Sequence, residues 1–385
     1  MIPYGRQDVT KKDIENVKKV LESDFLTQGP VVPKFEKAVS DYVGSKYGVA
    51  ANSATSALHI ACLALGVSEG DMVWTSANTF VASSNCALYC GSKIDFIDIN
   101  NSTLNICIDN LEEKLKKAEI NNTLPKVVIV VHLAGRSAEM REISILSKKY
   151  DFKIIEDASH AIGGSYLGNK IGSCKYSDIT VFSFHPVKII TSGEGGMALT
   201  NDRSLAESML LFRSHGITRN EEQMSQQSHG QWFYEQKLLG FNYRMTDIHA
   251  ALGLSQLERC DEYVSIRNQL ASIYNSKLDR SFFNLPYETS DSYSSYHLYI
   301  IRLKLDRIKK THKEVFNYMR DKGVLVNLHY IPVYFHTYYK KLGFKKGHCP
   351  NAEKYYSEAM SIPIFPALSG KDQLKVINFL SESVI

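Results

Sequence analysis

Residues 181–196 read VFSFHPVKIITSGEGG. This run starts as an apolar, β-prone segment, turns polar around Lys188 and ends in a glycine-rich turn. A lysine at the end of a buried strand is desolvated, and desolvation favours the neutral amine. The neutral amine is the form that condenses with an aldehyde. The stretch therefore predicts a strand that ends next to a reactive amine, with the hydroxyl of Ser183 close by.

Similar apolar runs recur through the first two hundred residues. Most are nearly continuous rather than alternating, which is typical of a sheet covered on both faces. Helical patterns lie between several of them, and this alternation predicts an α/β fold with a doubly wound, mostly parallel sheet. The seven predicted strands span 47–52, 72–76, 93–99, 126–132, 153–157, 178–184 and 196–200, and the helices between them span 54–65, 81–89, 111–118 and 140–149.

The C-terminal third has a different pattern. A long helix is predicted from Asp247 to about Leu278, and it leads the chain out of the large domain. Strands near 296–303 and 324–327 then predict a smaller α+β domain. We expect a large domain over 1–250, including the N-terminal segment, and a small C-terminal domain over 251–385.

Two further segments stand out near the ends of the large domain. Thr10 and Asp13 are placed to form a capping box for an amphipathic helix over 11–21. Residues 218–236 are polar, rich in glutamine and without periodicity. Such a stretch predicts a long functional loop.

Composition limits the possible partners. The chain is 44% hydrophobic and 22% charged, which is ordinary for a globular protein, and its net charge of +4 argues against a dedicated nucleic-acid binder. No apolar stretch reaches the length of a membrane span, and the N-terminus does not resemble a signal peptide. The seven cysteines lack metal-type spacing and indicate reduced, mostly buried thiols in a cytoplasmic protein. The twelve histidines form no HExxH or similar cluster, so no metal site is predicted.

The reactive lysine directs attention to pyridoxal phosphate. This cofactor needs a lysine for its aldehyde, an acid for its pyridine nitrogen, donors for its phosphate and a flat partner for its ring. Asp157 ends the run 153–157, so it should lie at the same carboxyl edge of the sheet as Lys188. Its carboxylate could equally cap a helix that follows the strand.

The phosphate and ring partners come from other strand ends. Residues 52–56 read NSATS and open a helix, whose free amides and dipole favour phosphate; Thr55, Ser56 and Ser183 would add hydroxyls. Capping by Ser53 alone would explain the same motif. Phe80 follows a strand and could stack on the ring, although a single phenylalanine is usually part of a core.

Five stretches together resemble the DegT/DnrJ/EryC1/StrS family of sugar aminotransferases, over essentially the full length. They are residues 26–30, 52–59, 156–160, the Lys188 run and 240–247. The resemblance implies the fold-type I, aspartate aminotransferase-like architecture of pyridoxal 5′-phosphate (PLP) enzymes. Family members without the lysine are dehydratases, so Lys188 favours transamination.

The resemblance also implies roles for individual residues. Lys188 would bind the cofactor aldehyde and serve as the catalytic base, and Asp157 would pair with the pyridine nitrogen. Asn242 would reach the phosphate of the neighbouring subunit, which implies a homodimer with shared active sites. Alternatively, Asn242 could be a turn or helix-capping residue. The other implied cofactor contacts are Thr55, Ser56 and Ser183 at the phosphate, Phe80 on the ring and His160 near the ring hydroxyl, unless His160 is a packed core residue.

The implied reaction uses L-glutamate as amino donor and a nucleotide-linked 4-keto-6-deoxy sugar as acceptor. Residues 23–30, 74–91 and 329–334 further resemble enzymes of pseudaminic acid biosynthesis, which implies a UDP-linked sugar. The predicted substrate contacts are Tyr4, Arg6, Gly29, Arg244, His329 and Tyr330, with Arg219 as a further candidate for phosphate.

Three alternatives remain at this point. The acceptor could be another UDP- or dTDP-linked 3- or 4-keto sugar. The chain could be an NAD-dependent nucleotide-sugar oxidoreductase or epimerase, although a glycine fingerprint after the first strand is lacking. It could also be a non-catalytic protein that kept this fold.

Overall fold

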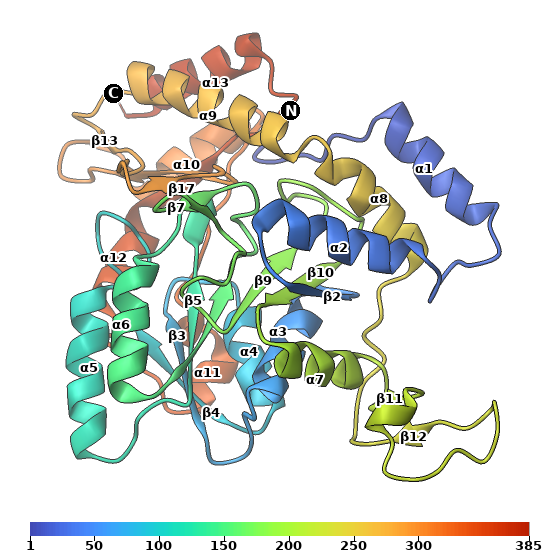
Figure 1. Ribbon diagram of the computed structural model, residues 1–385. Helices are drawn as coiled ribbons and strands as arrows, with labels where there is room; N and C mark the ends of the chain where they lie inside the picture. The colour runs from blue at the N-terminus through green and yellow to red at the C-terminus, as the bar shows by residue number, and fades with distance from the viewer. Residues whose placement is uncertain (385) are drawn as a thin grey trace.

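A seven-stranded sheet forms the centre of the computed structural model, which describes residues 1–384 (Figure 1). β10 runs antiparallel to both of its neighbours, and the other adjacent pairs are parallel. All seven predicted strands are present with ends within two residues of the prediction, so the mostly parallel sheet is confirmed. In spatial order the strands are β2 (Tyr47–Ala51), β10 (Gly196–Thr200), β9 (Ile179–Ser183), β6 (Lys153–Asp157), β5 (Val127–Val131), β3 (Met72–Ser76) and β4 (Lys93–Ile97).

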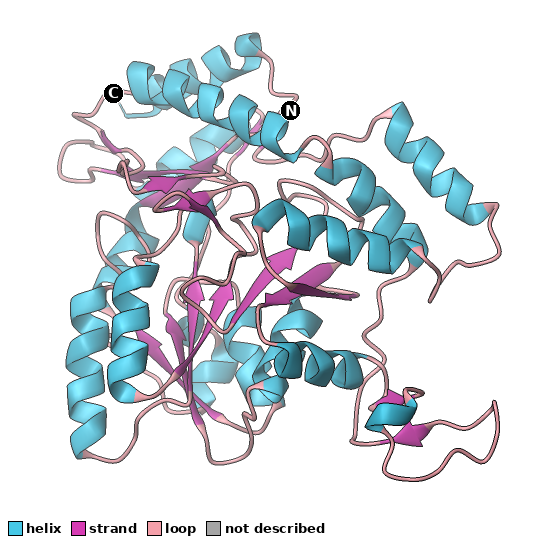
Figure 2. Cartoon of the chain, viewed as in Figure 1, coloured by secondary structure: helices cyan, strands magenta, loops and turns pink. Residues whose placement is uncertain are grey.

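Helices cover both faces of this sheet, as Figure 2 shows by colour. Every residue of β5 is buried, which explains why its sequence is a continuous apolar run. One face packs against α3 (Ala54–Ala64), α4 (Ala82–Tyr89) and α7 (Arg203–Arg213). The other packs against α2 (Val31–Val43), α8 (Asp247–Leu257), α5 (Ile108–Ile120) and α6 (Met140–Tyr150).

The N-terminal helix α1 (Lys11–Leu21) begins as predicted. The Thr10 amide donates to Asp13 Oδ2 at 2.8 Å, and Thr10 Oγ1 accepts from the Asp13 amide at 3.5 Å, which completes the capping box. The same carboxylate also accepts from Ser255, Gln256 and Arg259. These buried contacts join α1 to the end of α8.

The predicted single helix from Asp247 to Leu278 is wrong, because the structure has two helices there. α8 ends at Leu257, and α9 spans Cys260–Lys277. Arg259 lies between them with φ −106° and ψ 7°, and its guanidinium donates to Asp13 Oδ2 at 2.7 Å. This tertiary contact breaks a helix that periodicity alone would continue.

A second, three-stranded sheet lies in the C-terminal third. β15 (Tyr299–Leu303) is its central strand, and α9, α10 (His312–Asp321) and α13 (Gly370–Val384) contribute to its core. The predicted strand at 324–327 is β16 (Val324–Leu325), which pairs in parallel with β1 (Ile2–Pro3) rather than with β15. The edge strands are β13 (Phe283–Asn284) and β17 (Ala359–Ile362).

The division of the chain at residue 250 stays a prediction. The boundary falls inside α8, and residues of α9 belong partly to the core beneath the large sheet and partly to the core of the second sheet. Ile385, the last residue of the predicted small domain, lies outside the described residues.

The polar stretch predicted as a long loop projects from the body of the molecule, at the lower right of Figure 1. It forms a short hairpin of β11 (Ile217–Thr218) and β12 (Glu235–Gln236). The remaining elements are β7 (Ser165–Tyr166), β8 (Asn169–Lys170), β14 (Ser292–Tyr293), α11 (Thr337–Lys341), α12 (Pro350–Glu358) and three 3₁₀ turns at Leu133–Gly135, Glu221–Gln223 and Val333–Phe335. Within residues 1–384, no helix combines the length and apolarity that crossing a bilayer requires.

Candidate active site

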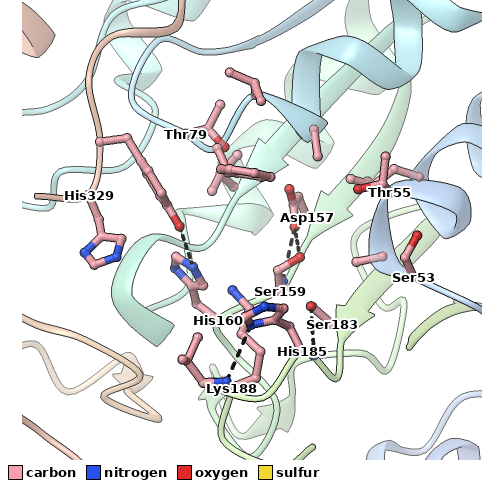
Figure 3. Close-up of a pocket in the computed structure, with 18 of the residues that line it drawn as sticks. Ser53, Thr55, Thr79, Asp157, Ser159, His160, Ser183, His185, Lys188 and His329 are labelled. Carbon is pink, nitrogen blue, oxygen red and sulfur yellow. Dashed lines mark hydrogen bonds between the residues drawn. The ribbon is translucent and has the colours of Figure 1, made fainter. Parts of the chain in front are cut away.

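A cavity of about 1140 Å³ opens at the carboxyl edge of the large sheet (Figure 3). The sheet register places several strand ends here. Gly196, the first residue of β10, lies opposite both Ser183 and Ala51, and Asp157 lies beside Val181. The residues that the sequence predicted at different strand ends therefore meet at one edge.

Lys188 lines this cavity from the turn after β9. Its backbone amide donates to the carbonyl of His185 at 2.9 Å, which fixes the turn. Burial lowers the pKa of the Lys188 amine to about 8, although the negative charge of Asp157 opposes the shift. The cavity therefore holds a lysine of which roughly a tenth is neutral at pH 7, far more than for an ordinary lysine.

Asp157 is held by hydroxyl and amide donors. Its side chain is 5% exposed. Oδ2 accepts from Ser83 Oγ at 2.6 Å, and Oδ1 accepts from Ser159 through the amide at 3.2 Å and the hydroxyl at 2.5 Å. No ion pair links it to a cation elsewhere in residues 1–384, so a protonated ring nitrogen would be its charge partner.

Glu156 faces the opposite side of the sheet, as the pleat predicts. Its carboxylate contacts His132 Nε2 at 2.6 Å and accepts from Thr180 Oγ1 at 3.0 Å, away from the cavity. These hydrogen bonds hold the pKa of Glu156 below its ordinary value against the opposing effect of burial.

The N-terminus of α3 forms a cradle for an anion. Ser53 caps the helix, because its Oγ accepts from the Ser56 amide at 3.1 Å. The amides of Ala54 and Thr55 and the Thr55 hydroxyl make no hydrogen bond with any described residue. Capping therefore accounts for only part of the motif, and the remaining donors suit a phosphate.

Gly196 lets the sheet approach this cradle closely. A Cβ at this position would lie 2.4 Å from the Ala54 amide nitrogen, so a larger residue would displace the start of α3.

His160 is neutral and fixed in orientation. Its Nδ1 accepts the Ala134 amide at 3.2 Å, so the proton belongs on Nε2, which lies 3.1 Å from Tyr330 Oη. Burial and the nearby charge of Lys188 hold the pKa of His160 well below its ordinary value. The imidazole is thus buried but also lines the cavity.

Phe80 is not a core residue. It is 56% exposed and lines the cavity, with its ring centroid 6.0 Å from that of Tyr330. It presents a flat apolar surface to whatever occupies the site.

Ten of the predicted residues meet in this cavity, and four do not. Gly29 is held outside by a 2.7 Å hydrogen bond from its amide to Asp247 Oδ2, and Asn242 is exposed where it pairs with Ser214. Within a single chain, Arg6, Gly29, Asn242, Arg244 and the further candidate Arg219 are not among the lining residues. Those that line it are Tyr4, Thr55, Ser56, Phe80, Asp157, His160, Ser183, Lys188, His329 and Tyr330.

Sequence reasoning missed three residues of the site. Ser159 sits two residues after Asp157, a spacing at which its hydroxyl and amide can reach the carboxylate, so it could have been found. Ser83 and His297 reach the site from distant segments and carry no local signal. The ring of His297 is tilted by 42° against that of His160, with the ring centroids 4.4 Å apart. His297 is 4% exposed, and its enclosed Nδ1 has no hydrogen-bond partner within residues 1–384.

The donor set fits PLP. An amine with a lowered pKa, a carboxylate without a cation partner, free amides at a helix N-terminus and an exposed aromatic ring match the four needs of this cofactor. Figure 3 shows Thr55 and Ser183 at the cavity together with Asp157 and Lys188.

Comparisons with known proteins agree with this geometry. The sequence profile described as the DegT/DnrJ/EryC1/StrS aminotransferase family matches residues 7–381. A UDP-4-amino-4,6-dideoxy-N-acetyl-β-L-altrosamine transaminase from Campylobacter jejuni is 39% identical over 97% of this chain and 94% of its own length.

Solved structures give the same result. Helicobacter pylori PseC, an aminotransferase involved in pseudoaminic acid biosynthesis, has a TM-score of 0.90 and 30% identity, covering 100% of this chain and 99% of its own. The PLP form of Spr1654, a sugar aminotransferase of Streptococcus pneumoniae, has a TM-score of 0.88 and 29% identity over 100% of this chain and 99% of its own.

Proposed function

The chain belongs to the DegT/DnrJ/EryC1/StrS aminotransferase family, and we propose that it aminates a nucleotide-linked 4-keto-6-deoxy sugar. It is a fold-type I, PLP-dependent aminotransferase. L-Glutamate is the proposed amino donor and UDP the proposed nucleotide. The full-length likeness to the altrosamine transaminase and to PseC supports a place in pseudaminic acid biosynthesis.

One observation carries the chemical part of the proposal: Lys188 and Asp157 line one cavity together with the N-terminus of α3. We assign Lys188 as the residue that holds the cofactor aldehyde and Asp157 as the partner of the ring nitrogen. Thr55, Ser56 and Ser183 would hold the phosphate. Phe80 would flank the ring, and His160 would lie near the ring hydroxyl.

The chain's own residues would then do the following work. PLP, when bound, supplies an aldehyde and a ring that withdraws electrons from the reacting carbon. The Lys188 amine, neutral in part because of its lowered pKa, would take the proton from the α-carbon of the donor and act as the general base and acid of the transfer. Asp157, fixed by Ser83 and Ser159, would hold the ring nitrogen in its protonated form.

A second subunit would complete the site. Asn242 is exposed and lies outside the cavity of its own chain, which suits the predicted reach to the phosphate of a partner subunit. The nucleotide sugar would contact three residues that line the cavity, Tyr4, His329 and Tyr330. We propose that it also contacts Arg6, Gly29 and Arg244 in the homodimer. We further propose that the enzyme is located in the cytoplasm.

The test is to incubate the holoenzyme and glutamate with a panel of UDP-, dTDP- and GDP-linked 3- and 4-keto sugars. Products are identified by mass spectrometry, and the Lys188→Ala variant is the control. We expect the UDP-linked 4-keto-6-deoxy sugar to gain an amino group in place of the keto oxygen. Transfer only to dTDP- or GDP-linked sugars, or only to C3, would contradict the proposed substrate.

A further inference from the structure

His297 is a buried histidine of the active-site cavity whose ring makes no hydrogen bond to any described residue. It lies two residues before β15 and lines the cavity, although it is only 4% exposed. Its Nδ1 is enclosed without a partner, and its Nε2 has no hydrogen bond within residues 1–384 either. Buried polar groups are normally paired, so this imidazole has hydrogen-bonding capacity left for a molecule that enters the cavity.

The fold fixes His297 beside His160. The Ser295 amide donates to the Gly135 carbonyl at 3.0 Å, and the Ser295 hydroxyl donates to the His160 carbonyl at 2.7 Å. The Ala134 amide of the same turn donates to His160 Nδ1 at 3.2 Å. This turn needs a glycine, because Gly135 has a φ of +100° and a Cβ there would lie 2.2 Å from Ser295 Oγ. The position of His297 is therefore set by the backbone around it and does not depend on a ligand.

A buried arginine lies directly behind His297. Arg267 is 1% exposed, and its Nη1 donates to the carbonyl oxygens of Tyr296 at 3.2 Å, His297 at 3.3 Å and Ile364 at 2.9 Å. No carboxylate within residues 1–384 forms an ion pair with it. Burial lowers its pKa to about 10, which leaves the guanidinium charged at neutral pH. A buried positive charge without a counter-ion favours the binding of an anion nearby.

The same surroundings keep the free His297 ring neutral. Burial, followed by the charges of His160, Lys188 and Arg267, holds the pKa of His297 well below its ordinary value. A neutral imidazole carries one N–H, and a hydrogen bond from an N–H to a carboxylate is stronger than one to a neutral acceptor. The effect of Lys188 on this pKa also indicates that the His297 ring lies near the reactive amine.

We propose that His297 binds the α-carboxylate of the amino donor, with the Arg267 charge supporting it from behind the cavity wall. This inference rests on the proposed transamination and names the residue that recognises the donor. The α-carboxylate is bonded to the carbon from which Lys188 would take a proton, so it has to lie near that amine. The other carboxylate of glutamate is two methylene groups further away, and the sugar ring separates the diphosphate of a nucleotide sugar from C4.

The proposal makes His297 specific to one half of the reaction. The amino donor carries an α-carboxylate, whereas a keto sugar has no such group at its reacting carbon. Loss of the His297 ring should therefore slow the reaction with the donor and leave the reaction with the sugar almost unchanged.

The first experiment measures the two half-reactions of the holoenzyme separately. Absorbance follows the conversion of the pyridoxal form to the pyridoxamine form by L-glutamate or by γ-aminobutyrate, which is glutamate without its α-carboxylate. In His297→Ala we expect the rate at low glutamate concentration to fall roughly 10- to 100-fold. The rate with γ-aminobutyrate and the amination of the keto sugar by the pyridoxamine form should stay within about twofold of the parent protein, because neither uses this contact.

Two further variants serve as controls for this comparison. His297→Gln keeps an N–H donor and should recover part of the rate with glutamate. His336→Ala removes a half-buried histidine that lines the same cavity without a side-chain hydrogen bond to a described residue, and it should react with glutamate like the parent protein. An equal loss with both donors, or in both half-reactions, would overturn the proposal.

The donor half-reaction needs no sugar, so a wrong sugar would contradict the proposed function without affecting this test. If the parent protein uses another amino acid in place of glutamate, the proposed donor is wrong. The same comparison is then made with that amino acid and its decarboxylated amine.

The second experiment uses the parent holoenzyme alone and applies even if His297→Ala fails to fold. Diethyl pyrocarbonate labels neutral histidines, and mass spectrometry gives the rate at each one. We expect 2-oxoglutarate, at about five times its dissociation constant, to slow the labelling of His297 about sixfold and to leave His336 unchanged. Equal labelling of His297 with and without 2-oxoglutarate would overturn the proposal.

Discussion

The pKa of Lys188 decides how the proposed active site loads its cofactor. Burial lowers it to about 8, and the charge of Asp157 limits the shift. Because only the neutral amine attacks an aldehyde, the neutral fraction, and with it the rate, should rise as the pH rises through this value. The neutral amine of an ordinary lysine appears only near pH 10.4, so the lowered pKa of Lys188 moves this rise to a lower pH.

We therefore expect the rate at which the apoenzyme binds PLP to increase with pH, with a midpoint near pH 8. Absorbance of the bound cofactor in stopped-flow mixing measures this rate. In Asp157→Asn the midpoint should move to lower pH, because the charge that favours the ammonium form is gone. A midpoint near pH 10 in the parent protein would show that Lys188 is not desolvated as the structure indicates.

The Asp157 carboxylate should matter for turnover more than for folding. Asp157→Asn keeps the size of the side chain and its acceptor oxygen but removes the charge that would keep the ring nitrogen protonated. We expect kcat to fall by roughly two to four orders of magnitude, while circular dichroism stays unchanged. Ser159→Ala, which leaves the Ser83 hydrogen bond in place, is the milder control; equal losses in both variants would contradict the assigned role.

The sequence predicted those residues of the site that end a strand or open a helix. Asp157, Ser183 and Thr55 lie where parallel strands share one edge, so their meeting follows from topology. Ser83 and His297 could not be found in this way, because their positions depend on how distant segments pack against the sheet.

Asp247 shows how one carboxylate joins two elements. It is fully buried at the start of α8, and its oxygens accept the amides of Gly29 at 2.7 Å, Val31 at 2.7 Å and Val32 at 3.1 Å. It thus satisfies the first amides of α2, a helix whose own N-cap is a proline without a capping side chain.

Asp247→Ala should lower the free energy of unfolding by about 1–3 kcal/mol, because buried amide donors lose their acceptor. Urea denaturation at fixed protein and PLP concentrations measures the change. Asp41→Ala, which removes only an exposed pair with Lys37 on α2, should stay within about 0.5 kcal/mol of the parent protein. Equal effects of the two substitutions would show that Asp247 does not stabilise the start of α2.

The helices and strands that could be predicted from the sequence are those whose position depends on burial alone. β5 is fully buried, and its apolar run marks it almost to the residue. The break between α8 and α9 was not predictable, because the contact of Arg259 with Asp13 joins positions that are distant in the sequence. β16 was found as a strand, but its partner β1 comes from the other end of the chain.

At the scale of the whole molecule, the cavity of one chain lacks part of the predicted site. Asn242 and three predicted substrate contacts lie outside its lining, which the proposed homodimer explains if a partner subunit supplies them. No pattern within one sequence can place residues across a subunit boundary, so these residues came from family resemblance alone.

Mixing an inactive variant with an impaired one tests this arrangement. Lys188→Ala removes the amine from its own site, and Asn242→Ala would weaken the phosphate site of the partner. A mixed dimer would contain one intact site, built from the Lys188 of one subunit and the Asn242 of the other. We expect activity to rise above that of either variant after refolding or co-expression; activity equal to the average of the two would contradict shared sites.

The central claim is that the cofactor is bound covalently to Lys188, and borohydride reduction tests it most directly. The holoenzyme is reduced, digested and mapped by mass spectrometry. We predict a phosphopyridoxyl group on the Lys188 side chain, and a protein that keeps its cofactor after denaturation. An adduct on any other lysine, or no adduct in a protein saturated with PLP, would contradict the account.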